Sequence, residues 1–181
     1  MSQGYGGLVH ELEVVGVRVE MPSNDPIVLL RERGGDRYLP IWIGAPEASA
    51  IAFAQQGVVP PRPLTHDLLK DVLDALGRTL EQVRIVEVRD NVYFAELGLD
   101  GGVTVSARSS DAIALALRVG CPILGADDVL AAGGIPVPDE DENEVEKFRE
   151  FLDQVRAEDF QGSGDEPPSA EPPPPPGPPR G

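Results

Sequence analysis

Two groups of strand-like segments constrain the fold of this chain most, and segments with helical spacing lie between the two groups. Each group holds three stretches with strand character, and runs of Asn, Asp, Gly and Pro separate the stretches. The predicted strands are 9–20, 26–33 and 37–44 in the first group, and 80–89, 92–99 and 103–107 in the second. The connections at 90–91 and 100–102 are short hairpin signals, so we expect the second group to form three sequential antiparallel strands.

Apolar residues alternate within the first group, as expected for half-buried strands. The alternation places Val15, Val17 and Val19 on one face of their strand, and Leu39, Ile41 and Ile43 on one face of another. Pro40 has no amide to donate to a neighbouring strand. Its strand is therefore expected at a sheet edge or at a local irregularity.

Three main helical segments accompany the strands. The first predicted helix covers residues 45–56. It ends before Gly57, a residue type that readily adopts the left-handed backbone conformation found after helix ends. A second helix, capped by the Thr65 hydroxyl and ended by Gly77, is expected to bury one apolar stripe against the sheet. That stripe consists of Leu68, Leu69, Val72, Leu73 and Leu76. A third, capped by Ser109 or Ser110, is apolar almost all round and is expected to be the central helix.

The pattern as a whole predicts an α+β fold, in which a mixed, largely antiparallel sheet packs with three to four helices. We place this domain at residues 1–138, with a short strand near 122–124 and a short helix near 127–132 completing its core. Residues 139–160 are expected to form an acidic amphipathic helix, and residues 161–181 a disordered, proline-rich tail. The helix and the tail could recruit a protein partner.

The net charge of −16 is concentrated toward the C-terminus. Before Asp139 there are 18 acidic and 11 basic residues, and from Asp139 onward there are 13 acidic and 4 basic residues. This balance opposes non-specific attraction to phosphate backbones and anionic membranes. Any contact with nucleic acid therefore requires a local basic patch or a bridging metal ion.

The single cysteine, Cys121, excludes an intramolecular disulfide and a cysteine-rich metal site, and it fits a reducing compartment. The sequence contains neither an apolar run of membrane-spanning length nor the pattern of a secretory signal. These features predict a cytoplasmic protein with no membrane partner.

Polar residues at the helix starts are the candidates for chemistry, because the common phosphate-binding, zinc-protease and nucleophile-elbow motifs are missing. Thr65-His66-Asp67 is consistent with a capped helix start. It is also consistent with an anion-binding site, in which Arg62 supplies positive charge and His66 supplies a transferable proton. His10 and His66 could also form an acid/base pair, although their spacing does not show that they meet.

Arg108 lies between a strand and an apolar helix, where a guanidinium needs a carboxylate or a phosphate partner. An internal ion pair and a ligand contact are equally consistent with that position. Glu47, Asp67 and Asp111 could together hold a divalent cation, but acidic residues at helix starts also complement the helix dipole.

Three motifs in order carry a resemblance to a known family. LPIWIGAPEASAIA at 39–52, RPLTHDLL at 62–69, and ARSSDAIALALR at 107–118 followed by PIL resemble the bifunctional nuclease family over residues 12–132. The resemblance implies an α+β domain that self-associates as a dimer or larger homo-oligomer. It also implies hydrolysis of phosphodiester bonds in DNA or RNA.

The third motif departs from the family pattern Asp-x-Arg-Pro-Ser-Asp-Ala. Arg108, Ser110, Asp111 and Ala112 match, whereas Ser106 stands at the first Asp and Ser109 at the Pro. One carboxylate is therefore missing, and a serine supplies neither its charge nor its basicity.

Under the nuclease hypothesis, His66 transfers a proton while Asp67 and Asp111 orient water or bind a metal ion. Glu47 completes the expected metal ligands, for Mg²⁺ or Mn²⁺. Arg62, Arg108 and Ser110 are the expected substrate-binding residues. The alternative is a non-catalytic regulatory or interaction module that binds a small anionic ligand or a protein partner. The acidic charge and the missing Asp favour this alternative, whereas the retained Arg-x-Ser-Asp and Thr-His-Asp favour the enzyme.

Overall fold

The fold was analysed in a computed structural model, which describes residues 7–20 and 23–136. The predicted acidic helix at 139–160 and the tail at 161–181 lie outside the described residues. None of the described helices is long and apolar enough to cross a membrane.

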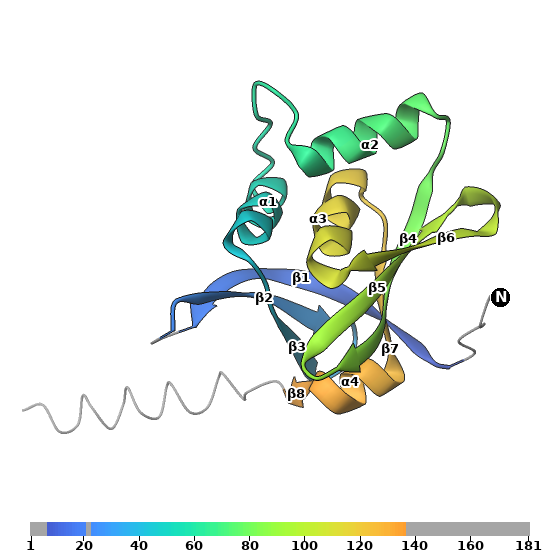
Figure 1. The fold of residues 1–181 in the computed structure, drawn as a ribbon. Helices are drawn as coiled ribbons and strands as arrows, with labels where there is room; N and C mark the ends of the chain where they lie inside the picture. Colours follow the sequence, from blue (N-terminus) through green and yellow to red (C-terminus); the bar gives the residue numbers. More distant parts are fainter. Residues whose placement is uncertain (1–6, 21–22, 137–181) are drawn as a thin grey trace, which may run out of the picture. The chain divides into compact units, whose positions relative to one another are not determined.

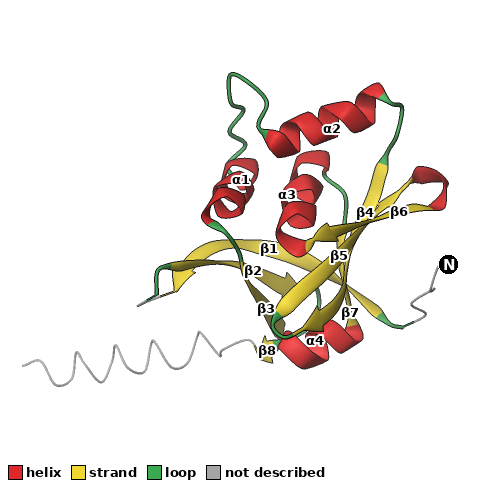
Figure 2. Cartoon of the chain, viewed as in Figure 1, coloured by secondary structure: helices red, strands yellow, loops and turns green. Residues whose placement is uncertain are grey.

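Eight strands and four α-helices make up the described part of the chain (Figure 1 and Figure 2). The strands are β1 (Val9–Glu20), β2 (Asp25–Glu32), β3 (Arg37–Trp42), β4 (Leu80–Arg89), β5 (Val92–Leu99), β6 (Val103–Arg108), β7 (Ile123–Ala126) and β8 (Ile135–Pro136). The helices are α1 (Ala45–Gln55), α2 (Thr65–Ala75), α3 (Ser109–Val119) and α4 (Asp127–Gly133), with one 3₁₀ turn at Asp100–Gly102.

All eight strands form one sheet in the order β6-β5-β4-β7-β1-β2-β3-β8. Each pair of neighbours is antiparallel except β4 and β7, which run parallel. The two predicted groups of strands thus become the two halves of the sheet, and β7 joins them. This arrangement confirms the predicted α+β fold with a mixed, largely antiparallel sheet.

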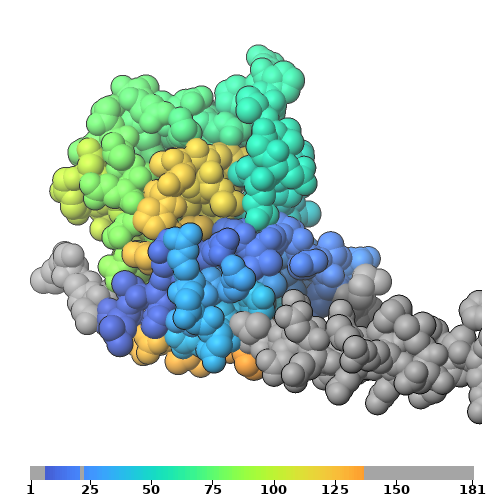
Figure 3. All heavy atoms as spheres, turned by 180° about the vertical axis from the view of Figure 1, so that it is seen from behind, coloured from blue at the N-terminus to red at the C-terminus, as the bar shows by residue number. Residues whose placement is uncertain are grey.

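Helix α3 is the central helix, as its composition predicts. It contacts α1, α2 and the strands β4, β5 and β6, and every residue of 112–116 is buried. Seen from behind, the gold segment around α3 lies between the green α2, the turquoise α1 and the blue N-terminal strands (Figure 3). Gly120 ends the helix at a φ of 80°, a left-handed conformation that an L-residue adopts at a cost.

Helix α2 corrects the prediction that its apolar stripe is buried against the sheet. The helix contacts α3, which itself occupies the adjoining sheet surface, and none of the residues of α2 is buried. Leu73 packs against the core, but Leu68 is 53% exposed and Leu76 is 70% exposed. The helical spacing therefore identified the helix correctly but not the surface on which it lies.

Strand β1 corrects the predicted face of Val15, Val17 and Val19. A bulge between Val14 and Gly16 inserts Val15 as an extra residue opposite β2, and such an insertion shifts the side-chain alternation by one position. Val14 and Val17 consequently both pack against the core, while Val15 is exposed. Val19 shares the face of Val17 but is 59% exposed near the end of the strand. Leu39 and Ile41 of β3, and Ile43 just after it, face the core as predicted. Pro40 lies beyond the two residues of β3 that pair with β8, at a free edge.

Candidate active site

The second and third sequence motifs meet where the start of α2 lies against α3. His66 Nε2 lies 3.0 Å from Asp111 Oδ1, although 45 positions separate the two residues in the chain. His66 is in the first turn of α2, and Asp111 is in the first turn of α3. The His66 side chain is 12% exposed and that of Asp111 is 33% exposed. The two helix starts therefore present a histidine–carboxylate pair at the protein surface.

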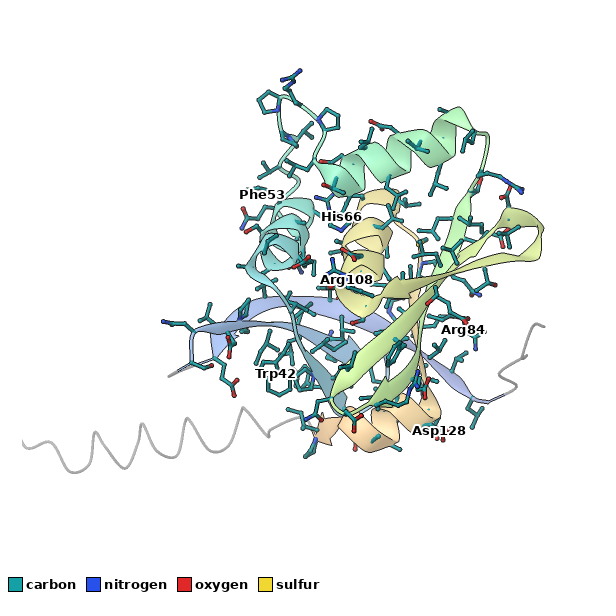
Figure 4. All side chains as sticks on the ribbon, viewed as in Figure 1. Trp42, Phe53, His66, Arg84, Arg108 and Asp128 are labelled. Carbon is teal, nitrogen blue, oxygen red and sulfur yellow. The ribbon has the colours of Figure 1, made fainter. Side chains whose placement is uncertain are left out.

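Arg108 connects this pair to α1. Its Nε donates to Asp111 Oδ2 at 2.6 Å, and its Nη2 donates to Glu47 Oε1 at 2.8 Å. Both contacts are charge-assisted hydrogen bonds, which are stronger than neutral ones. The Arg108 side chain nevertheless remains 68% exposed, and Figure 4 shows it between α1 and β6 near the start of α3. The described contacts use two of its five N–H groups, so the others can meet a ligand.

A second ion pair fixes α2 on α3. Arg118 Nε donates to Asp67 Oδ1 at 2.5 Å, and Arg118 Nη1 donates to the Ala114 carbonyl at 2.9 Å. The other oxygen of Asp67 accepts from the Leu64 amide at 2.9 Å. Asp67 thus forms its ion pair with Arg118 and not with Arg108, and it anchors the turn of α2 that carries His66.

Arg118 is a site residue that the sequence analysis missed. It follows Asp111 by seven positions, which is two helical turns, so both side chains lie on the face of α3 that meets α2. Asp111 contacts His66, and Arg118 contacts the next residue, Asp67. This spacing of opposite charges was the signal that could have identified the pair.

The predicted serine and threonine caps are wrong. Helix α2 begins at Thr65 and α3 begins at Ser109, and neither helix has a side-chain cap from these residues. In α2, the Asp67 carboxylate takes the Leu64 amide instead. In α3, the strand β6 runs directly into the helix, and Ser109 and Ser110 are buried. Ser110 therefore lies beside the site but is 7% exposed.

A cavity of about 480 Å³ opens beside the His66–Asp111 pair. Its polar rim includes His66, Ser106, Arg108 and Asp111. Its apolar wall consists of Leu69, Leu73, Leu97, Leu99, Val105, Ala107, Ala112 and Leu115. Most small-molecule sites combine an apolar wall with a few polar groups in this way.

Not every predicted residue joins this cluster. Arg62 lies in the linker between α1 and α2, is exposed, and does not line the cavity. Glu47 reaches the cluster through Arg108, and its side chain is 15% exposed. No three His, Cys, Asp or Glu side chains converge as metal ligands among residues 7–20 and 23–136. The arrangement of Glu47, Asp67 and Asp111 thus does not fit the predicted metal site.

The other histidine belongs to a separate cluster. His10 Nδ1 lies 2.7 Å from Glu32 Oε1, and His10 Nε2 lies 2.9 Å from Asp127 Oδ1. Arg37 binds both oxygens of the buried Glu32, at 2.8 and 3.1 Å. His10 and His66 therefore have different partners, and the described contacts do not join them as an acid/base pair.

The pKa values of the two site carboxylates are lowered. Partial burial raises the pKa of Asp111, but the hydrogen bonds from Arg108 and His66 outweigh it. Burial likewise raises the pKa of Asp67, and the Leu64 amide and Arg118 outweigh that effect. Both groups are therefore charged at neutral pH, and Asp111 can hold His66 with a proton on Nε2.

These pKa shifts predict that the fold loses stability in acid. A carboxyl group with a lowered pKa stabilises the folded state above its ordinary pKa and loses that contribution as the pH falls. We expect the contribution of these two carboxylates to the free energy of unfolding to be constant above about pH 5 and to decrease below about pH 4. Urea unfolding of the parent, Asp67→Asn and Asp111→Asn across this range measures the effect. Equal pH dependence in all three proteins would contradict the assignment.

The sequence around this cluster matches a known protein family. The model of the bifunctional nuclease domain matches residues 28–138, which contain every residue of the cluster. The chain belongs to the bifunctional nuclease domain family. An uncharacterized protein of Mycobacterium tuberculosis (strain ATCC 25618 / H37Rv) is 54% identical over 84% of this chain and 99% of its own length.

The plant relatives in the bifunctional nuclease domain family are more distant. Bifunctional nuclease 2 of Arabidopsis thaliana is 33% identical over 54% of this chain and 31% of its own length. Bifunctional nuclease 1 of Oryza sativa subsp. indica is 29% identical over the same shares of the two chains. The chain thus spans about a third of the length of each of these plant proteins.

The structure also places the two departures from the motif of the bifunctional nuclease domain family. Ser106, at the position of the first Asp, lines the cavity next to Arg108. Ser109, at the position of the Pro, is buried in the first turn of α3. The aspartate that the resemblance implies at position 106 would therefore lie in the lining of this cavity.

Proposed function

We propose that this protein is a nuclease that hydrolyses phosphodiester bonds of DNA or RNA at the His66–Asp111–Arg108 cluster. The observation that carries the proposal is the 3.0 Å contact between His66 and Asp111, which joins two family motifs at the rim of a cavity. The names of the plant relatives and the family model support the same reaction class.

In this mechanism His66 is the general base. In this role His66 Nε2–H donates a hydrogen bond to Asp111 Oδ1, and the unprotonated Nδ1 takes a proton from water. The water oxygen bonds to phosphorus as the ester P–O bond breaks, and solvent protonates the leaving oxygen. Arg108 donates its remaining N–H groups to the phosphate oxygens, where negative charge develops. Asp67 does not touch the reacting atoms and acts as a positioning residue for His66.

The proposed reaction does not require a divalent cation, and the effect of one is measured by varying it in the assay. In the described part of the chain, no three His, Cys, Asp or Glu side chains come together as ligands of a metal ion. The proposed reaction therefore uses the side chains alone. Mg²⁺ or Mn²⁺ bound with a substrate phosphate would supply positive charge at the phosphoryl oxygens. Assays with each metal and with chelator measure that contribution directly.

A non-catalytic anion-binding module is the second candidate. It is favoured by the contacts of Arg108, which already bridges Glu47 and Asp111 as a structural ion pair would. Ser106 in the cavity wall favours the same reading, because it lacks the charge of the family's Asp. In such a module the cavity binds a small anion and catalyses no reaction.

Cleavage of labelled single-stranded DNA and RNA by the purified full chain separates the two candidates. The nuclease proposal predicts cleavage by the parent and none by a His66→Ala, Asp111→Ala double variant prepared in the same way. Each preparation is assayed with Mg²⁺, with Mn²⁺ and with chelator. Equal cleavage by both proteins would indicate a contaminant or another site. Absence of cleavage by the parent under every condition would favour the binding module.

A further inference from the structure

Trp42 lies in a second cavity on the other side of Arg108. This cavity has a volume of about 400 Å³ and is lined by Trp42, Tyr93, Arg108 and the start of α3. Arg108 is also in the rim of the His66 cavity. Arg108 therefore contributes to the linings of both cavities, and only the His66 cavity has a role in the proposed reaction.

The indole of Trp42 is exposed and held in place. Leu39 and Ile41 of the same strand are buried on the core side, and the alternation puts Trp42 on the opposite side, where it is 50% exposed. Its Nε1 donates to Glu20 Oε2 at 2.7 Å. Figure 4 shows Trp42 on the sheet below Arg108. An exposed aromatic ring that lines the same cavity as a cation is an arrangement on which an unpaired base can stack.

We propose that Trp42 is a base-stacking residue of a second subsite, which takes an unpaired nucleobase adjoining the phosphate at Arg108. The inference rests on the proposed nuclease function and extends it to the form of the substrate. A base that is paired and stacked inside a duplex does not offer its face to a protein side chain. The subsite therefore favours single strands and frayed ends over intact duplex.

The charges around Trp42 favour a base over a phosphate. Asp25 lines the cavity, and Glu20 holds the indole. Both carboxylates repel a phosphate, whereas the face of a base is uncharged. Arg108 is the cation in the lining of this cavity, so the backbone phosphate lies on Arg108 and the base extends toward Trp42.

The test uses intrinsic fluorescence, because Trp42 is the single tryptophan of the whole chain. The full chain carrying His66→Ala, which leaves the probe uncut, is titrated with a short oligothymidylate. An abasic oligonucleotide of equal length and a duplex are the comparison probes. We expect the oligothymidylate to quench the tryptophan and the other two to leave it nearly unchanged. Equal quenching by the abasic probe, or no quenching by any probe, would overturn the inference.

Affinity provides the independent measurement. In the same His66→Ala background, Trp42→Ala is expected to weaken binding of labelled oligothymidylate by about 5- to 100-fold in anisotropy titrations. Trp42→Phe keeps an aromatic face and should lose less. Phe53→Ala is the matched control, because Phe53 is also an exposed aromatic residue, at 39%, but lines neither cavity. Unchanged affinity in Trp42→Ala would also overturn the inference.

Cleavage by proteins with His66 intact distinguishes the two possible failures. If the parent cleaves single strands but its tryptophan is not quenched, the stacking subsite is wrong and the nuclease proposal stands. If binding quenches the tryptophan and the parent cleaves nothing, the nuclease proposal is wrong and the base-binding subsite stands. Thermal unfolding of each variant verifies that the fold is retained.

Discussion

Replacing His66 with alanine is expected to lower kcat/KM for phosphodiester cleavage by about 10²- to 10⁴-fold, the usual contribution of a general base. The substitution removes the imidazole that Asp111 orients at 3.0 Å and leaves Arg108 bound to Asp111 and Glu47. Because His66 packs at the rim of the cavity rather than in the core, the fold should survive. Rates of cleavage of labelled single-stranded substrates measure the effect.

His10→Ala is the matched control for this prediction. His10 also contacts two carboxylates, those of Glu32 and Asp127, but it lines neither the His66 cavity nor the Trp42 cavity. We expect His10→Ala to keep the cleavage rate of the parent. A His66→Ala protein as active as the parent would rule out the His66–Asp111 pair as the catalytic centre. A similar loss in both variants would point to a general effect on the fold.

Replacing Arg118 with alanine is expected to lower the free energy of unfolding by on the order of 3 kcal/mol. The Arg118 side chain is 7% exposed, and its removal leaves the Asp67 carboxylate, itself 25% exposed, without its cation. The same substitution removes the ion pair between Asp67 of α2 and Arg118 of α3, and leaves the His66–Asp111 contact between these helices. Because His66 adjoins Asp67, we also expect the cleavage rate to fall, even though Arg118 is not in the lining of the cavity.

A double-mutant cycle tests this role of Arg118. If the ion pair carries the effect, Asp67→Ala together with Arg118→Ala should destabilise the protein less than the sum of the single variants. Lys70→Ala, which breaks the exposed Lys70–Asp74 pair on the same helix, is the control and should leave urea unfolding unchanged. Additive single effects would show that Arg118 contributes through packing and its hydrogen bond to the Ala114 carbonyl rather than through Asp67.

The order of elements could be predicted because its signals are local. Alternating valines and isoleucines, the Asp90-Asn91 turn and the glycines that end the helices each specify a few neighbouring residues. The exposed stripe of α2 and the bulge in β1 could not be predicted in this way. They depend on which surface α3 occupies and on how β1 pairs with β2, and neither is encoded in the spacing of one segment.

The candidate site shows the same division. The helix starts were correctly expected to hold polar residues, and the structure brings His66 and Asp111 together. Sequence reasoning assigned Asp67 to the chemistry, whereas Arg118 holds it as part of the support for α2. Ion-pair partners are chosen by contacts between elements, and only the seven-residue spacing of Asp111 and Arg118 gave a hint of them.

The direct passage from β6 to α3 limits how the protein can respond to a ligand. Arg108 is at once the last residue of a strand, opposite Phe94 of β5, and the residue before the first helical turn. With no loop on either side, its backbone has no hinge about which it could swing. The backbone of Arg108 is thus fixed, and the ion pairs with Asp111 and Glu47 orient its guanidinium before any ligand arrives.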